Sequence, residues 1–284
     1  MQTNNRQPIR IIPRLDIKGS NLVKGIRLEG LRVMGLPEIF AKYYYENGAD
    51  ELFFQDVVAS LYERNSLTHI IEKVAKEVFI PLTVGGGIRS LDNIYKILRS
   101  GADKVSINTA ALADPNFIKL ASRNFGSSTI SVSIEAIKQL DGRYLAFSDN
   151  GRNCSNKELL EWSKQIEDLG AGEIILTLVD KEGTGEGYDN KIIEIVSEQI
   201  KIPLVIHGGT GRKEHALNLL SKINLSGIAI ASMFHYEFLD SISNTKVQKN
   251  EYDISNIKNI YPCSINQLKT YLSAEGLICR SNVN

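Results

Sequence analysis

The sequence predicts an α/β fold, a closed (β/α)8 TIM barrel of eight parallel strands built from two homologous half-barrels. Three segments recur in the same order, and the first two pairs are each 122 residues apart (170 minus 48, 206 minus 84). Short apolar runs also alternate with longer amphipathic stretches, a pattern typical of parallel strands covered by helices. The repeated pairs are Gly48–Phe54 with Gly170–Leu176, Val84–Gly87 with Ile206–Gly209, and Ile107–Thr109 with Ile230–Ser232.

Eight strands are expected, four in each half, because eight of these runs are short and rich in β-branched residues. A twofold repeat favours closure into a barrel, since each half supplies half of the ring. The alternative is an open, doubly wound sheet. The expected strands are Ile9–Leu15, Glu51–Gln55, Leu82–Val84, Lys104–Ile107, Thr129–Ile134, Glu173–Leu178, Leu204–Ile206 and Ile228–Ala231. The expected helices include Leu67–Val78, Leu91–Ser100, Lys157–Leu169, Lys191–Gln199 and Lys213–Ser221.

We expect residues 1–284 to form one domain, with half-barrels at about 9–125 and 126–239. Residues 240–263 interrupt the alternation of apolar strands and amphipathic helices, because they are polar and rich in Asn, Ser and Lys. They are interpreted as an inserted loop, which is followed by a final helix and tail at 264–280. A loop of this length is uncommon without a role, although a tolerated surface insertion is the simpler explanation.

Composition excludes several classes of function. The 284 residues carry a formal net charge of zero, whereas a nucleic-acid surface normally needs a basic excess. The three cysteines are widely spaced and odd in number, so neither a disulfide framework nor a metal site is expected. The polar N-terminus lacks the pattern of a signal peptide, and no stretch is apolar enough to span a bilayer. We therefore expect a cytoplasmic protein without a membrane partner.

Two acidic residues end equivalent strands of the two halves. Asp16 follows the first strand and Glu135 follows the fifth, 119 residues later (135 minus 16). The active site of such a barrel lies at the C-terminal ends of the strands, so these carboxylates should face each other across the mouth. Two facing carboxylates can divide the roles of general acid and base. The alternative is that each one caps a helix or pairs with a nearby lysine.

Glycine-rich turns at strand ends predict two anion sites, one in each half. Glycine lets the backbone approach an anion closely, and the N-terminus of a following helix favours negative charge. Lys24 follows the first strand and could bind a phosphate, orient Asp16 or lie solvated at the surface. The paired arrangement predicts a ligand with a phosphate at each end. The candidate residues are Gly86, Gly87, Asn108 and Thr109 in the first half, and Gly183, Gly208, Gly209, Ala231 and Ser232 in the second.

Four charged residues begin strands and should lie at the opposite rim of the barrel. They are Arg10, Glu51, Lys104 and Glu173. Two acids and two bases that alternate by strand indicate a ring of salt bridges closing the barrel floor. The histidines share no metal-type spacing, and no cofactor is expected.

The chain resembles the imidazole glycerol phosphate synthase cyclase subunit (HisF) family over nearly its whole length. The most specific match is Gly101–Ala111 (GADKVSINTAA), which follows Thr83–Ile88 (TVGGGI). The other matching motifs are Leu15–Lys18, Val23–Gly25, Asp50–Leu52, Gly170–Leu176 and Gly183–Tyr188.

The resemblance implies a lyase of histidine biosynthesis within a glutamine amidotransferase complex. A partner glutaminase of class I would release ammonia, which passes through the barrel. There it would convert a bisphosphate ribotide into imidazole glycerol phosphate and aminoimidazole carboxamide ribotide. The resemblance also implies roles for single residues: acid and base for Asp16 and Glu135, support of the second phosphate for Glu182, an ammonia gate for Arg10, Glu51, Lys104 and Glu173, and partner docking for Asp103.

The sequence departs from the family in the predicted acid/base region. Glu135 stands where the family usually has Asp, and Glu182 also replaces an Asp. Pro13 and Arg14 stand where the family usually has Ala and Cys. A longer side chain shifts the geometry of proton transfer, and a misplacement of about one ångström can be costly to rate.

These departures resemble a branch of the family associated with surface-polysaccharide (lipopolysaccharide) genes. The resemblance to that branch implies that the chain, with its glutaminase, supplies ammonia to a separate enzyme that builds an acetamidino sugar. A further alternative is a non-catalytic scaffold that binds and activates the glutaminase. The related histidine-pathway isomerase is disfavoured, because it does not need the charges at the floor.

Overall fold

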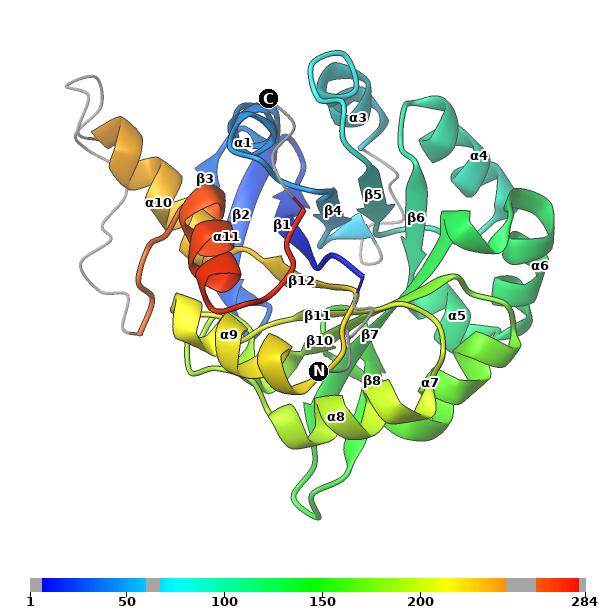
Figure 1. Ribbon diagram of the computed structural model, residues 1–284. Helices are drawn as coiled ribbons and strands as arrows, with labels where there is room; N and C mark the ends of the chain where they lie inside the picture. The colour runs from blue at the N-terminus through cyan, green and yellow to red at the C-terminus, as the bar shows by residue number, and fades with distance from the viewer. Residues whose placement is uncertain (1–6, 60–66, 244–258, 281–284) are drawn as a thin grey trace.

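The computed structural model describes residues 7–59, 67–243 and 259–280. Its centre is a closed ring of eight parallel strands surrounded by helices, so the predicted (β/α)8 barrel is confirmed (Figure 1). The ring is closed because β7 pairs with β10 as well as with β6, which makes the open-sheet alternative wrong. Around the ring the strands are β1 (Arg10–Lys18), β4 (Leu52–Asp56), β5 (Leu82–Gly85), β6 (Lys104–Ile107), β7 (Ile130–Lys138), β10 (Glu173–Leu178), β11 (Leu204–His207) and β12 (Gly227–Ile230).

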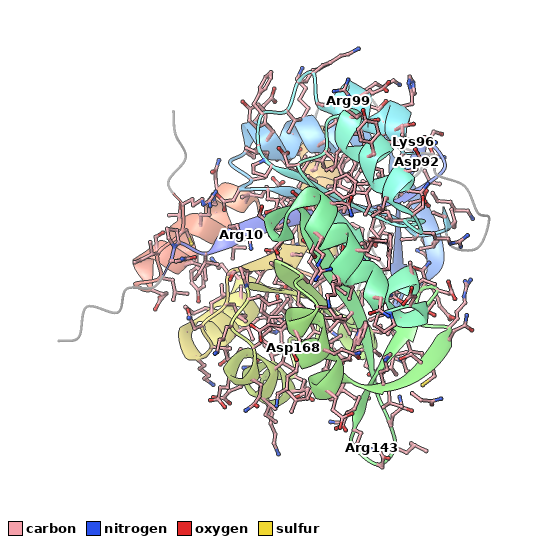
Figure 2. The ribbon with its side chains drawn as sticks, turned by 90° about the vertical axis from the view of Figure 1, so that its right-hand side faces the viewer. Arg10, Asp92, Lys96, Arg99, Arg143 and Asp168 are labelled. Atoms are coloured by element: carbon pink, nitrogen blue, oxygen red, sulfur yellow. The ribbon has the colours of Figure 1, made fainter. Side chains whose placement is uncertain are left out.

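Helices cover the outside of the ring, as Figure 1 shows. In α4 (Leu91–Arg99) Ile94 and Ile97 are buried, while the ion pair of Asp92 and Lys96 is exposed on the outer surface (Figure 2). This is the amphipathic pattern from which the helices were predicted. The other helices are α1 (Pro37–Glu46), α3 (Thr68–Val74), α5 (Thr109–Ala113), α6 (Asn116–Phe125), α7 (Leu159–Asp168), α8 (Asn190–Gln199), α9 (Lys213–Lys222), α10 (Ser232–Ser243) and α11 (Ile265–Ala274), with 3₁₀ turns η1 (Ser127–Thr129) and η2 (Val179–Lys181).

Alternation along the strands separates the hydrophobic core from the barrel interior. In β1, Ile11, Leu15 and Ile17 belong to the core between strands and helices. Successive side chains of a strand point to opposite faces, so Arg10, Ile12, Arg14 and Asp16 point into the barrel. Ile12 packs there in a separate small cluster. One strand therefore carries side chains from the floor of the barrel to its mouth.

Two antiparallel hairpins extend the barrel and were not predicted. β1 continues past Leu15 and pairs with β2 (Asn21–Ile26), which pairs with β3 (Glu29–Gly35). β7 continues past Ile134 and pairs with β8 (Tyr144–Ser148), which pairs with β9 (Asn153–Glu158). The predicted helix at Lys157–Leu169 consequently begins only at Leu159. Both halves thus carry the same order of elements, which supports a division near residue 125.

The start predicted for the inserted loop at 240–263 is wrong. Residues 240–243 form the last turn of α10, and residues 244–258 lie outside the described residues. At its other end the segment packs against the barrel mouth, where the backbone N–H of Tyr261 donates to the Gly211 carbonyl at 2.6 Å. The final helix is present as α11, begun by a capping box of Ser264 and Gln267.

Candidate active site

Asp16 and Glu135 lie on opposite sides of the barrel mouth. Asp16 is on β1 and Glu135 on β7, and these strands are four steps apart around the ring in either direction. Each lies near the C-terminal end of its strand and points inward by the alternation described above. Both are buried, with 2% and 8% of their surface exposed. The structure thus brings the two predicted carboxylates to one mouth.

The carboxyl group of Glu135 is largely shielded from solvent. Burial raises the pKa of its carboxyl to about 7, with a smaller contribution from the charge of Asp149. The backbone N–H of Gly151, which donates to Oε2 at 2.8 Å, and the charge of Arg14 oppose this shift. A carboxyl with such a pKa exchanges protons readily near neutral pH, as a general acid or base requires.

Asp16 has a different partner. The Nε of Arg14 donates to Oδ1 of Asp16 at 2.8 Å, and both side chains are buried. Nη1 of the same guanidinium reaches Oγ1 of Thr177 on β10 and Nδ1 of His207 on β11, each at 3.1 Å. Arg14 also lies over the ring of Phe53 on β4, 5.3 Å from its centroid. The Arg14 side chain therefore crosses the barrel interior beneath the carboxylates.

One pocket lies at the ends of β4, β5 and β6, beside Glu135. All four residues predicted for the first anion site line it: Gly86, Gly87, Asn108 and Thr109. Gly86 has a φ of +100°, and a Cβ there would overlap Asp56, so only glycine fits this turn. Gln55 and Arg89, which the sequence analysis did not select, line it as well.

A second pocket lies at the ends of β11 and β12. Seven predicted residues line it, namely Lys24, Glu182, Gly183, Gly208, Gly209, Ala231 and Ser232, and His207 joins them. Lys24 is not a solvated surface residue, because its ammonium is buried in an ion pair with Glu182. The other oxygen of Glu182 accepts from the backbone N–H of Leu28 at 2.9 Å. Glu182 therefore acts on this pocket through Lys24.

Each hairpin reaches across two strands to the loop beyond one pocket. The turn between β2 and β3 contacts the loop after β10, where the N–H of Arg27 donates to the Glu182 carbonyl at 2.9 Å. The turn between β8 and β9 contacts the loop after β4, where Asn150 donates to the Val57 carbonyl. Arg27, Leu28, Asp149 and Asn150 all have positive φ, which costs energy in residues other than glycine. These contacts hold both turns in place.

The four predicted gate residues form one ion-pair network at the floor. Arg10 pairs with Glu51 at 2.6 Å and with Glu173, and Lys104 pairs with Glu51 at 2.8 Å and with Glu173 at 3.0 Å. Burial alone would raise the pKa of Glu173, but the two cations together lower it. Figure 2 shows Arg10 at the beginning of β1. Two positive and two negative charges therefore balance at the end of the barrel opposite the mouth.

An apolar layer lies on one side of the barrel interior, between this network and the mouth. It consists of Ile12, Phe53, Ile175, Val205 and Ala229, one residue from each of five strands, all buried. The inward side chains of the other three strands are polar, because Thr83 on β5 donates to Glu51 and Ser106 on β6 bonds to Ser133 on β7 at 2.5 Å. Among the described residues, no group of three or more His, Cys, Asp or Glu could hold a metal ion. In the same ranges, no helix combines the length and hydropathy needed to cross a membrane.

Residues 10–240 match the protein family described as Histidine biosynthesis protein. The chain belongs to this family. The imidazole glycerol phosphate synthase subunit HisF of Legionella pneumophila is 50% identical over 206 residues, covering 72% of this chain and 97% of that protein. The HisF subunit of Hydrogenobaculum sp. is 45% identical over 228 residues, covering 80% and 90%. That of Streptococcus gordonii is 42% identical over 237 residues, covering 84% and 94%.

His207 was not among the residues predicted for the second anion site, yet it lines that pocket and is bonded to Arg14. Its place at the end of β11, next to Gly208 and Gly209, was the available signal. Asn150 and Gly151 were missed because the β8–β9 hairpin was missed. The insertion and α11 lie beyond the part of the chain that matches the family.

Proposed function

We propose that this chain is the cyclase subunit of an imidazole glycerol phosphate synthase, a lyase that works with a glutaminase subunit in the cytoplasm. It takes ammonia and a bisphosphate ribotide and forms imidazole glycerol phosphate and aminoimidazole carboxamide ribotide. Relatives with this name match over 90% or more of their length, which supports the proposal. The observation that carries it is the pair of pockets beside a mouth where Asp16 and Glu135 are opposed.

In this proposal the two pockets bind the two terminal phosphates of the ribotide. Glycine turns let backbone groups approach the phosphate oxygens, and the second pocket adds the buried ammonium of Lys24. Ser232 begins α10, whose N-terminus also favours an anion. Holding both ends fixes the reacting centre between the carboxylates, and such positioning can supply a large part of a rate enhancement.

Asp16 and Glu135 divide the proton transfers. Bond formation to the ammonia nitrogen releases protons, and cleavage to the second product requires one on the departing nitrogen. Because burial brings the pKa of Glu135 to about 7, this residue can supply a proton near neutral pH. Asp16, ion-paired with Arg14, accepts protons on the opposite side.

The barrel interior is the route for ammonia. Neutral ammonia crosses an apolar layer at low cost, whereas ammonium would lose its hydration without a compensating charge. The layer around Phe53 and Ile175 therefore favours passage of the neutral form. The ion-pair network below it must rearrange to admit ammonia, which allows a docked glutaminase to control entry.

The glutaminase docks on the floor of the barrel. Asp103 is exposed there, beside Lys104, and its Oδ2 accepts from the Leu82 N–H at 2.8 Å. That bond fixes its carboxylate near the gate. The docking role rests on this position and on the resemblance of the surrounding motif.

The experiment is a cyclase assay with the bisphosphate ribotide and excess ammonium salt, without glutaminase. Turnover by the wild-type chain is expected, and Asp16→Asn should abolish it while still forming the complex with glutaminase. Asp92→Asn is the control, because Asp92 is exposed on the outer surface of α4, where it pairs with Lys96. Full turnover by Asp16→Asn would contradict the assignment of Asp16.

The alternative of ammonia supply to a sugar-amidating enzyme keeps the same gate and layer. It is favoured by one feature, the Arg14 guanidinium in the mouth, where the family usually has a cysteine. Binding of the ribotide without turnover, combined with glutamine-dependent release of ammonia by the complex, would support the alternative over the cyclase.

A further inference from the structure

Arg14 connects four strands of the barrel through one buried side chain. It starts on β1, bonds to Thr177 on β10 and His207 on β11, and lies over Phe53 on β4. Only 4% of its surface is exposed. A buried guanidinium is tolerated only when its donors are satisfied, and the partners on the described residues include Asp16 as counter-charge.

The contact with His207 fixes the state of the imidazole ring. A guanidinium can only donate, so Nδ1 of His207, 3.1 Å from Nη1 of Arg14, must accept and carries no proton. The neutral ring then holds its proton on Nε2. Oγ1 of Thr177 lies 3.3 Å from the same Nδ1 and can donate to it as well. If Nδ1 were protonated, its N–H would face the N–H of Arg14 Nη1, and two donors would meet without an acceptor.

The surroundings of His207 also oppose a positive charge on the ring. Burial lowers the pKa of His207, and the charges of Arg14 on β1 and Lys24 on β2 lower it further, with a contribution from His235 on α10. The nearby carboxylates are already paired, Asp16 with Arg14 and Glu182 with Lys24. No free anion of the described pocket is therefore left to stabilise an imidazolium.

We propose that Arg14 is a positioning residue that holds His207 as a neutral Nε2–H donor for the anion bound in the second pocket. His207 lines that pocket, and Nε2 is the ring nitrogen that can donate to a ligand. The ligand class is a phosphate ester of a sugar, and this identity alone rests on the proposed function. Arg14 thus acts on the ligand through His207, while its other end holds Asp16.

The direct test is the tautomer of His207, measured by long-range proton–nitrogen correlation on the ¹⁵N-labelled full chain. The variant His207→Gln identifies the signals of this ring among those of the four histidines. In the wild-type protein we expect the Nε2–H tautomer, unchanged between pH 5.5 and 8. In Arg14→Met we expect a mixture of the Nδ1–H and Nε2–H tautomers, because the guanidinium that requires Nδ1 to accept is gone. A wild-type ring with the proton on Nδ1, or identical spectra for the variant, would overturn the proposal.

A second test measures the affinity for inorganic sulfate, whose charge is constant over this pH range. His207→Gln keeps an acceptor and a donor and should retain affinity within about threefold, whereas His207→Leu should lose about tenfold because the donor is gone. Equal affinity of both variants would contradict the donor role. If Arg14→Met does not fold, Arg14→Gln replaces it, because its neutral amide can present an acceptor as well as a donor to Nδ1 and should admit the other tautomer.

These measurements need neither ribotide nor glutaminase. A chain that fails the cyclase assay can still show the locked tautomer and the sulfate contact, which would leave this inference standing without the proposed reaction. A chain that turns over ribotide but shows a titrating His207 would refute the positioning role alone.

Discussion

Glu135→Gln should make the free energy of unfolding less dependent on pH. The folded pKa of Glu135 is about 7 and its ordinary value is 4.5, so the folded state binds a proton where the unfolded state has already lost it. The stability from this group is therefore fully present below pH 4.5 and is lost as the pH rises to 7. At 1.36 kcal/mol for each pH unit the whole effect is about 3 kcal/mol, most of which falls between pH 5 and pH 8.

The assay is urea unfolding of wild type and variant at pH 5 and pH 8. Relative to wild type, Glu135→Gln should gain about 2 to 3 kcal/mol in free energy of unfolding on going from the lower to the higher pH, because glutamine stays neutral at both. Glu186→Gln is the matched control, since Glu186 is an exposed glutamate in the loop after β10. Parallel changes in all three proteins would refute the reasoning that burial keeps Glu135 protonated.

Three further perturbations test the gate and the second pocket. Lys104→Met should lower glutamine-dependent turnover of the complex at least tenfold while ammonia-dependent turnover falls less than threefold, with exposed Lys96→Met as control; equal losses would argue against the gate. Gly183→Ala should weaken inorganic phosphate binding about tenfold by calorimetry, because its φ is +71° and its Cβ would lie 2.7 Å from the Gly25 carbonyl oxygen and 3.3 Å from Nζ of Lys24; unchanged binding would show that this loop is not part of the site. Glu182→Gln should destabilise the chain by about 3 kcal/mol in urea, because it leaves the buried ammonium of Lys24 without a counter-charge, and a loss below about 1 kcal/mol would contradict that.

The barrel strands could be predicted because burial on both faces makes them short and almost wholly apolar. Asp16 and Glu135 could be predicted because strand ends converge at one mouth in this fold. The first hairpin could not be predicted in the same way, because Arg27 and Leu28 form a left-handed turn without the Asn or Gly that usually marks one. The second hairpin did carry a signal, Asp141-Gly142 before β8 and Asn150-Gly151 after it, but β9 (Asn153–Glu158) is polar on both faces and does not resemble a buried strand.

The contacts of Arg14 depend on the tertiary structure of the closed barrel rather than on spacing along the sequence. Its partners Thr177 and His207 are 163 and 193 residues away, on strands that are brought near only when the ring closes. The position of Arg14 within the first strand indicates a side chain that points into the barrel, but no periodicity could show which groups that side chain would contact. The charge balance of the floor was simpler to predict, because Arg10, Lys104 and Glu173 begin strands and Glu51 directly precedes one.

The crossed hairpins make the two halves dependent on each other. The turn that leans over the β11–β12 pocket belongs to the first half, and the turn that leans over the β5–β6 pocket belongs to the second. A fragment containing only one half would consequently have the strand ends that line its pocket but not the hairpin turn that contacts the adjacent loop. It could complete that pocket only by pairing with a second fragment. In the proposed function, a bisphosphate bound in both pockets would contact elements of both halves, so its binding energy would also stabilise the association of the halves.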